Sequence, residues 1–125
     1  MTKRTQEQWK TITKYKDFEF TGIYEISSWG NIRNRITKTP LATYSNASGN
    51  GYLKTKIFDT NGKRRALYIH QLVALYFLEA IPGCEVNHID GNTRNNSVSN
   101  LEWISHKENI QEIHRMRKLA MAANQ

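Results

Sequence analysis

The feature that most constrains the fold is a polar stretch at residues 85–110, EVNHIDGNTRNNSVSNLEWISHKENI. Its middle is rich in Asp, Gly and Asn, which favour turns and make poor core material. Glu85–His88 and Leu101–Ile104 on either side are predicted as short strands, and Ser105 with Glu108 matches the capping box that begins a helix. The stretch therefore predicts two strands around a long polar loop, followed by a helix. The loop is either a turn-rich connector or a site.

A β-hairpin is predicted upstream, over residues 52–69. The run YLKTKIF alternates apolar and basic side chains, so one face is apolar and the other is basic, and Asn61-Gly62 is a strong turn signal. The residues expected on the basic face are Lys54, Lys56 and one or two of Lys63, Arg64 and Arg65. Such a ribbon can lie along phosphates or enter a major groove. A solvated outer face of a sheet is an equally good interpretation of any single lysine.

Apolar residues at helical spacing predict a helix over His70–Ala80, ended by Pro82-Gly83. His70 falls on the apolar side of this helix, so a buried, hydrogen-bonded structural histidine is its expected role. Short mixed runs over residues 9–36 predict short strands and turns. Three aromatic residues are expected in the core: Tyr24, Trp29 and Trp103. Two histidines of the last helix are expected at the surface: His106 and His114.

The charge of the chain is unevenly distributed. The 125 residues carry a net charge of +7, and residues 1–68 hold 13 Lys and Arg against 5 Asp and Glu, whereas residues 69–125 hold 5 against 6. A basic front half suggests a polyanionic partner, although a basic surface kept for solubility is the alternative. The chain has a lone cysteine, Cys84, and no apolar N-terminal signal, and its longest apolar run covers only residues 72–78. These features favour a single cytoplasmic domain that does not enter a membrane.

Three residues of the predicted ββα unit are placed to meet: His88 at a strand end, Asn100 at the start of the next strand, and Asn109 on the inward face of the helix. Together with IHQLVALYF, VNHIDGN and NLEW, they resemble the HNH endonucleases with a ββα-metal fold, in the phage and intron homing branch. WKTI and GIYEISSWGNIRN resemble the NUMOD4-type module that often precedes this domain. The resemblance covers roughly residues 9–115.

The resemblance implies an α+β fold with a small N-terminal antiparallel β region and hairpin, followed by a ββα-metal motif with flanking helices. It divides the chain into a flexible start (1–8), a basic DNA-binding β region with the hairpin (9–68) and an HNH nuclease domain (69–125) whose ββα core spans about 85–118. It also implies a phage or mobile-element origin, with action in the host cytoplasm.

The resemblance further implies metal-dependent hydrolysis of phosphodiester bonds in duplex DNA. His88 would be the general base, since a neutral imidazole can accept a proton near pH 7. Asn100 would hold the loop and orient the His88 ring, and Asn87 and Asn109 would bind one Mg²⁺ or Mn²⁺ ion. Asn87 stands where homing relatives often have Asp. Asp90 could supply a carboxylate, but an Asx turn is the preferred interpretation of HIDG.

The residues expected to contact DNA are Arg33, Arg35, Lys54, Lys56, Lys63, Arg64, Arg65 and Arg94. No organic cofactor is expected. The alternative function is an inactive DNA-binding module that keeps the HNH fold, which the amide at Asn87 favours; an RNA-binding domain is a weaker third. Because the chain ends soon after the last helix, modest specificity, a homodimer or partner protein, or truncation from a longer protein is expected.

Overall fold

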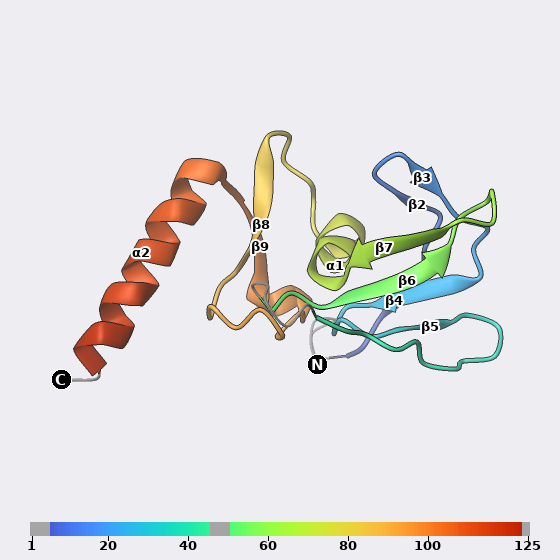
Figure 1. The fold of residues 1–125 in the computed structure, drawn as a ribbon, viewed down its shortest axis with the longest axis horizontal. Helices are drawn as coiled ribbons and strands as arrows, with labels where there is room; N and C mark the ends of the chain where they lie inside the picture. The colour runs from blue at the N-terminus through green and yellow to red at the C-terminus, as the bar shows by residue number, and fades with distance from the viewer. Residues whose placement is uncertain (1–5, 46–50, 124–125) are drawn as a thin grey trace.

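The computed structural model describes residues 6–45 and 51–123, so residues 1–5 of the expected flexible start lie outside it. The N-terminal part is antiparallel, as predicted: β1 (Trp9–Thr11), β4 (Tyr24–Ser27) and β5 (Ile32–Asn34) form one sheet in the order β1-β4-β5. A second small pair, β2 (Lys14–Tyr15) and β3 (Phe18–Glu19), is drawn at the upper right of Figure 1.

The predicted hairpin is confirmed as β6 (Lys54–Phe58) and β7 (Arg64–Tyr68), with Phe58 opposite Arg64. Its turn differs from a two-residue Asn-Gly turn. Asp59 and Lys63 still pair, at 2.8 Å between Asp59 N and Lys63 O, and Gly62 takes the left-handed conformation at φ +78°. The loop therefore has three residues and ends in a glycine bulge, a common alternative that also suits the twist of the strands.

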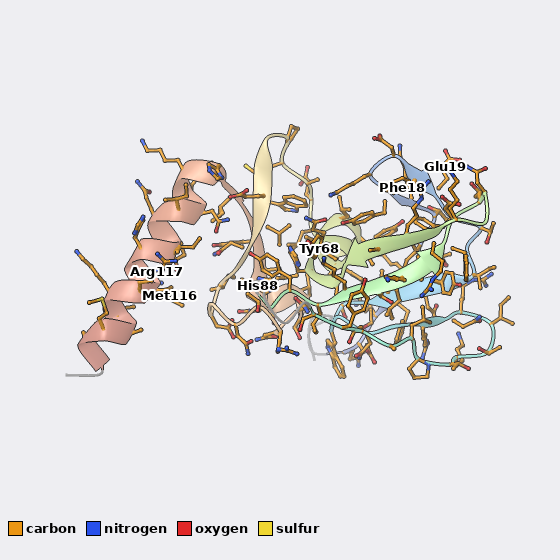
Figure 2. The ribbon with its side chains drawn as sticks, viewed as in Figure 1. Phe18, Glu19, Tyr68, His88, Met116 and Arg117 are labelled. Carbon is orange, nitrogen blue, oxygen red and sulfur yellow. The ribbon has the colours of Figure 1, made fainter. Side chains whose placement is uncertain are left out.

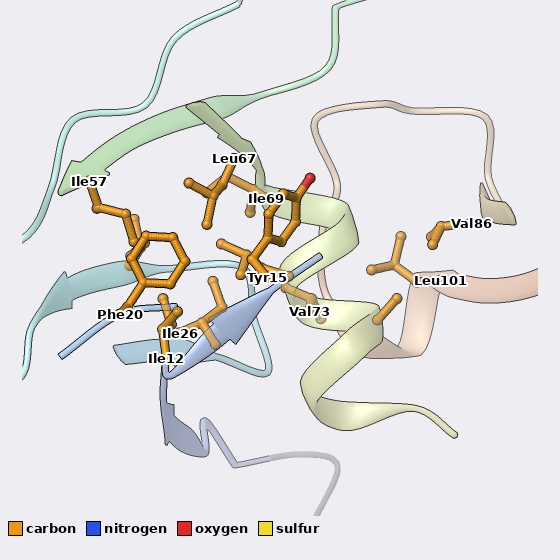
Figure 3. Packing of buried hydrophobic residues seen from close by; sticks show 13 residues of the cluster. Ile12, Tyr15, Phe20, Ile26, Ile57, Leu67, Ile69, Val73, Val86 and Leu101 are labelled. Carbon is orange, nitrogen blue, oxygen red and sulfur yellow. The ribbon is translucent and has the colours of Figure 1, made fainter. Parts of the chain in front are cut away.

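Helix α1 (Ile69–Phe77) follows the hairpin directly and supplies the centre of the core. It ends three residues earlier than predicted, because Leu78 is already extended at φ −118° and ψ 152°. Figure 3 shows Ile57 and Leu67 of the hairpin, Ile26 of β4 and Val73 of α1 packed together in this core. Burial of these side chains, each worth roughly 1.5–3 kcal/mol, joins the N-terminal sheet to the rest of the molecule.

The predicted ββα unit is confirmed as β8 (Cys84–His88), β9 (Leu101–Ser105) and α2 (His106–Ala123), with a 3-10 turn (Val98–Asn100) before β9. Val86 of β8 and Leu101 of β9 join the main core from the side (Figure 3). Helix α2 packs on β8 and β9 and projects away from the body (Figure 1). Within the described residues the structure thus has the predicted α+β class. No helix there is long and apolar enough to cross a membrane.

The core predictions for the aromatic residues hold for two of the three. Tyr24 and Trp103 pack against the core, but Trp29 is 47% exposed. The prediction for Trp29 was wrong because the residue lies in a tight turn whose backbone, rather than its indole, is packed: the neighbouring Ser27 and Ser28 are buried. His106 and His114 are exposed, as expected.

Candidate active site

Strand β8 separates two sets of side chains on its two faces. Val86 and His88 face the body, where Val86 joins the core, whereas Glu85 and Asn87 face α2. The antiparallel register places Asn87 opposite Glu102 and His88 opposite Leu101. Because side chains alternate along a strand, the imidazole and the amide of consecutive residues belong to different surroundings.

The loop between β8 and β9 is folded by its own polar side chains. The Asn100 amide donates to Asp90 Oδ1 and Asn95 O, both at 2.9 Å, and its Oδ1 accepts from Asp90 N at 3.1 Å. Asp90 Oδ1 also accepts from Asn92 N at 2.8 Å, which is the expected Asx turn. The hydrogen bond from Asn95, with those from Asn92 and Asn100, holds the pKa of Asp90 below its ordinary value.

His88 lies between α2 and the hairpin (Figure 2) and is 5% exposed. Its Nε2 lies 2.8 Å from Asn96 Oδ1, and its ring stacks on Tyr52 with the centroids 5.7 Å apart. Among the described residues the ring makes its side-chain hydrogen bond with Asn96 and not with Asn100. Asn96 therefore takes the place that was expected for Asn100, whose side chain instead hydrogen-bonds to Asp90 and Asn95 and holds the loop.

His70 lies behind His88, with ring centroids 5.1 Å apart, and also contacts Tyr52 and Tyr68. It is buried as expected, but its Nδ1 has no hydrogen-bond partner within the described residues. Burial, with smaller contributions from His88 and Lys16, lowers the pKa of His70 from 6.5 to about 3. His70 is therefore a neutral side chain at physiological pH.

The α2 side of β8 holds a cluster of amides and carboxylates. Asn87 Nδ2 donates to Glu102 Oε1 at 3.0 Å, and Asn109 Nδ2 donates to Glu85 Oε1 at 2.7 Å. Glu85 also pairs with His106 Nδ1 at 3.1 Å. The Asn109 hydrogen bond first, and His106 second, lower the pKa of Glu85, so its carboxylate is ionised at neutral pH.

This cluster fits a hard divalent cation. Both amide nitrogens donate to carboxylates, which leaves the amide oxygens of Asn87 and Asn109 as the atoms that could bind an ion, and oxygen is the ligand atom that Mg²⁺ prefers. Within residues 6–45 and 51–123, no three His, Cys, Asp or Glu side chains are grouped so that they could hold a metal ion. An ion here would therefore need the two amides together with water and phosphate oxygens.

The basic residues divide into two groups. Lys54, Lys56 and Arg64 share the outer face of the hairpin, and Lys63 is exposed at its turn. Four of the expected DNA-contacting residues have internal partners: Arg33 (Glu25, 2.6 Å), Arg35 (Gly22 O, 2.8 Å), Arg65 (Asp59, 2.8 Å) and Arg94 (Ser45, 3.0 Å). Arg65 lies on the inward face of β7, since it pairs in register with the buried Ile57.

Comparison with known proteins finds two family models that match most of this chain. A model of the HNH endonucleases matches residues 67–111, and a model of the NUMOD4 motif matches residues 7–66. The two matches run without a gap over the N-terminal sheet, the hairpin, α1, β8, β9 and the start of α2. Residues 67–111 of this chain are therefore similar to the HNH endonucleases, and residues 7–66 are similar to the NUMOD4 motif. The predicted resemblance is thereby confirmed.

Relatives of this chain come from viruses and phages. An uncharacterised HNH endonuclease of Acanthamoeba polyphaga mimivirus is 37% identical over 113 residues, which is 86% of this chain and 26% of the relative. DNA endonuclease I-HmuI of Bacillus phage SP01 is 31% identical over 105 residues, which is 83% of this chain and 56% of that protein. The chain thus spans between about a quarter and just over half of these relatives.

A solved structure described as "DNA binding and cleavage by the HNH homing endonuclease I-HmuI" has the same fold as this chain. It aligns with a TM-score of 0.71 at 29% identity and covers 94% of this chain and 68% of that one. The agreement extends over the N-terminal β region as well as the ββα unit.

Four side chains of the candidate site were missed by sequence reasoning: Tyr52, Glu85, Asn96 and Glu102. A signal existed for the two carboxylates, because strand alternation places Glu85 on the face of Asn87, and Glu102 is part of the NLEW motif. Asn96 belongs to the Asp-, Gly- and Asn-rich middle of the loop, for which turns were the expectation. Its contact with His88 spans eight residues of irregular loop, for which no periodicity exists.

Proposed function

We propose that this chain is a divalent-metal-dependent DNA endonuclease that hydrolyses phosphodiester bonds in duplex DNA. One observation carries the proposal: a buried imidazole and an amide whose nitrogen donates to a carboxylate stand on consecutive residues, His88 and Asn87, at the end of β8. Consecutive Cα atoms are about 3.8 Å apart. Because the two side chains leave opposite faces of β8, a phosphate would have to lie at the end of the strand, where His88 is the last residue, to be near both groups.

His88 acts in this proposal as the general base toward a water molecule. With Asn96 Oδ1 accepting from Nε2, the proton of the neutral ring is on Nε2, and Nδ1 keeps the lone pair that takes a proton. Tyr52 and His70 pack against the ring and limit its rotation. Asn100 serves the base indirectly by fixing the loop that carries Asn96.

Asn87 and Asn109 would hold one Mg²⁺ or Mn²⁺ ion through their side-chain oxygens, while Glu102 and Glu85 orient the two amides. When bound, the ion would stabilise charge on the scissile phosphate and the leaving oxygen. The two carboxylates add negative charge beside the amides and so partly compensate for the missing Asp at position 87.

DNA would be held mainly by residues 9–68, with residues 69–125 carrying the chemistry. Lys54, Lys56, Lys63 and Arg64 can contact phosphates without first breaking an internal hydrogen bond to a described residue, whereas Arg94 would exchange its bond to Ser45. Such contacts make affinity fall steeply with salt. The sequence holds the HNH set once, so we propose that one chain cuts one strand, and that a second copy or a second encounter is needed to cut both.

The test is a supercoiled-plasmid assay with Mg²⁺, Mn²⁺ or EDTA, which separates nicked from linear DNA. Wild type and the control His114→Ala, which changes an exposed histidine of α2, should convert the plasmid with metal and not with EDTA. His88→Ala should lose at least 100-fold in rate, within the usual range for a general base. Cleavage that survives in His88→Ala would refute the assignment of the base.

An inactive DNA-binding module is the second candidate, favoured by the amide at Asn87. In that case wild type would retard the plasmid in a gel without cutting it in either metal. The variant Asn87→Asp distinguishes the cause: activity gained on restoring a carboxylate would locate the defect at the ion site, and continued inactivity would favour the module.

A further inference from the structure

Asn96 is buried at 4% exposure although it lies in a polar surface loop. Its side-chain oxygen is 2.8 Å from His88 Nε2. Burying an amide is unfavourable unless it is hydrogen-bonded, and the contact with His88 meets that requirement. The burial itself has a cause outside the loop.

That cause lies in the N-terminal sheet, at the turn formed by Ser28, Trp29 and Gly30. Gly30 has φ +87°, and a Cβ built on it would lie 2.8 Å from Asn96 Cβ and 3.2 Å from Asn96 O. Val98 N donates to Ser28 O at 2.7 Å two residues farther along the loop. The turn therefore lies directly against Asn96, at a distance that only glycine permits.

The turn is itself rigidly held. The buried Ser27 Oγ accepts from Trp29 N at 3.2 Å and from Asn31 N at 3.0 Å, and Gly30 N donates to Ser27 O at 3.0 Å. A surface that cannot move away leaves Asn96 one position, in which its amide meets the His88 ring. The contacts form a continuous chain from β4 to the imidazole.

We propose that Asn96 is a positioning residue for His88, and that the Ser28–Gly30 turn of the N-terminal module holds it in place. The module then contributes to the cleavage step as well as to DNA contact. Asn96 fixes the ring as the Nε2–H tautomer and so keeps the lone pair on Nδ1. The consequence for the reaction rests on the proposed function of His88, but the tautomer itself does not.

The first measurement is made without metal or DNA: ¹⁵N–¹H NMR of the imidazole rings, whose nitrogen shifts distinguish the two tautomers. In wild type, His88 should show protonated Nε2. Asn96→Ala should give a mixture of tautomers, whereas Asn96→Asp, which keeps an oxygen acceptor in the same place, should retain Nε2–H. A His88 ring that stays Nε2–H in Asn96→Ala would overturn the positioning role.

The module's part is tested by Gly30→Ala against a matched control, Gly62→Ala. Both positions have positive φ, +87° and +78°, so both variants carry similar backbone strain, but a Cβ at Gly62 has no atom within 4 Å. Gly30→Ala should disturb the His88 tautomer as Asn96→Ala does, and Gly62→Ala should not. If the two glycine variants give the same His88 spectrum, the module does not position Asn96.

Cleavage kinetics then measure the effect on the reaction. Loss of a residue that orients a functional group lowers activity by roughly 10- to 100-fold in comparable sites. We expect that loss in kcat for Asn96→Ala and Gly30→Ala, with KM within about twofold, because neither change removes a DNA contact. A rise in KM with kcat unchanged would overturn the inference. Absence of cleavage in wild type would refute the proposed function alone, since the tautomers would still be decided by NMR.

Discussion

Replacing His70 by phenylalanine should flatten the response of the protein's stability to acid. His70 is 4% exposed and packs against the rings of Tyr52, Tyr68 and His88. Its Nδ1 makes no hydrogen bond to any described residue, so the change loses none there and removes a buried polar atom of a kind that costs about 1–3 kcal/mol when unpaired. We therefore expect His70→Phe to be about as stable as wild type at pH 7.

The effect of pH follows from the difference between the folded and unfolded pKa of His70. Burial lowers the folded pKa from 6.5 to about 3, so between these values the unfolded chain binds a proton that the folded protein does not. The stability from keeping His70 neutral is complete above pH 6.5 and is lost as pH falls toward 3. Each pH unit is worth about 1.36 kcal/mol, which gives a loss of roughly 2 kcal/mol at pH 5.

The assay is thermal unfolding followed by circular dichroism at pH 7 and pH 5. For a chain of this size, 2 kcal/mol corresponds to roughly 6–10 °C in Tm, so wild type should lose that much more than His70→Phe on acidification. His114→Gln, an exposed histidine variant, should behave as wild type. His70→Gln provides a smaller neutral side chain if the phenyl ring does not fit. Equal acid sensitivity in wild type and both His70 variants would refute the reasoning.

Three further predictions concern the ion site, the basic face and the last helix. Asn87→Asp should lower the Mg²⁺ concentration for half-maximal nicking several-fold, because a carboxylate is a stronger ligand than an amide; a metal titration measures it. Lys54→Ala should reduce the slope of log K for DNA binding against log salt concentration by about 0.9. Arg65→Ala should leave that slope unchanged and lower Tm, since Arg65 pairs with the buried Asp59. Ser105→Ala should destabilise the start of α2 by about 1 kcal/mol, seen as faster amide exchange there, because Ser105 Oγ accepts from Glu108 N.

The features that sequence predicted correctly depend on neighbours in the chain. The hairpin follows from the alternation around Lys54 and Lys56, and the start of α2 from Ser105 and Glu108, whose side chains meet at 2.9 Å. The fold of the ββα unit was predictable for the same reason. The inward face of Arg65 depends on the hairpin register, which pairs Arg65 with Ile57. That register follows from a turn that is one residue longer than the expected two-residue turn.

The roles of the asparagines could not be assigned from the sequence, because they depend on contacts between distant segments. Asn95, Asn96 and Asn100 are chemically identical and lie within one loop, yet only Asn96 meets the His88 ring. Gly30, which is far away in sequence, lies against Asn96, and in our proposal this contact sets the difference. A pattern read along the chain treats these amides as equivalent turn formers.

The two faces of β8 also differ in what holds their side chains in place. The His88 face is enclosed by the core, so the His88 ring is held in place without any ligand. The opposite face is completed by Asn109 of α2, a helix that packs on β8 and β9 and leaves Ile110, Ile113 and Leu119 largely exposed. Elements with few buried apolar contacts open at low free-energy cost. Under the proposed function, the Asn87–Asn109 face is therefore the part that DNA and metal would have to order, and their affinity would include the free energy of fixing α2 against β8.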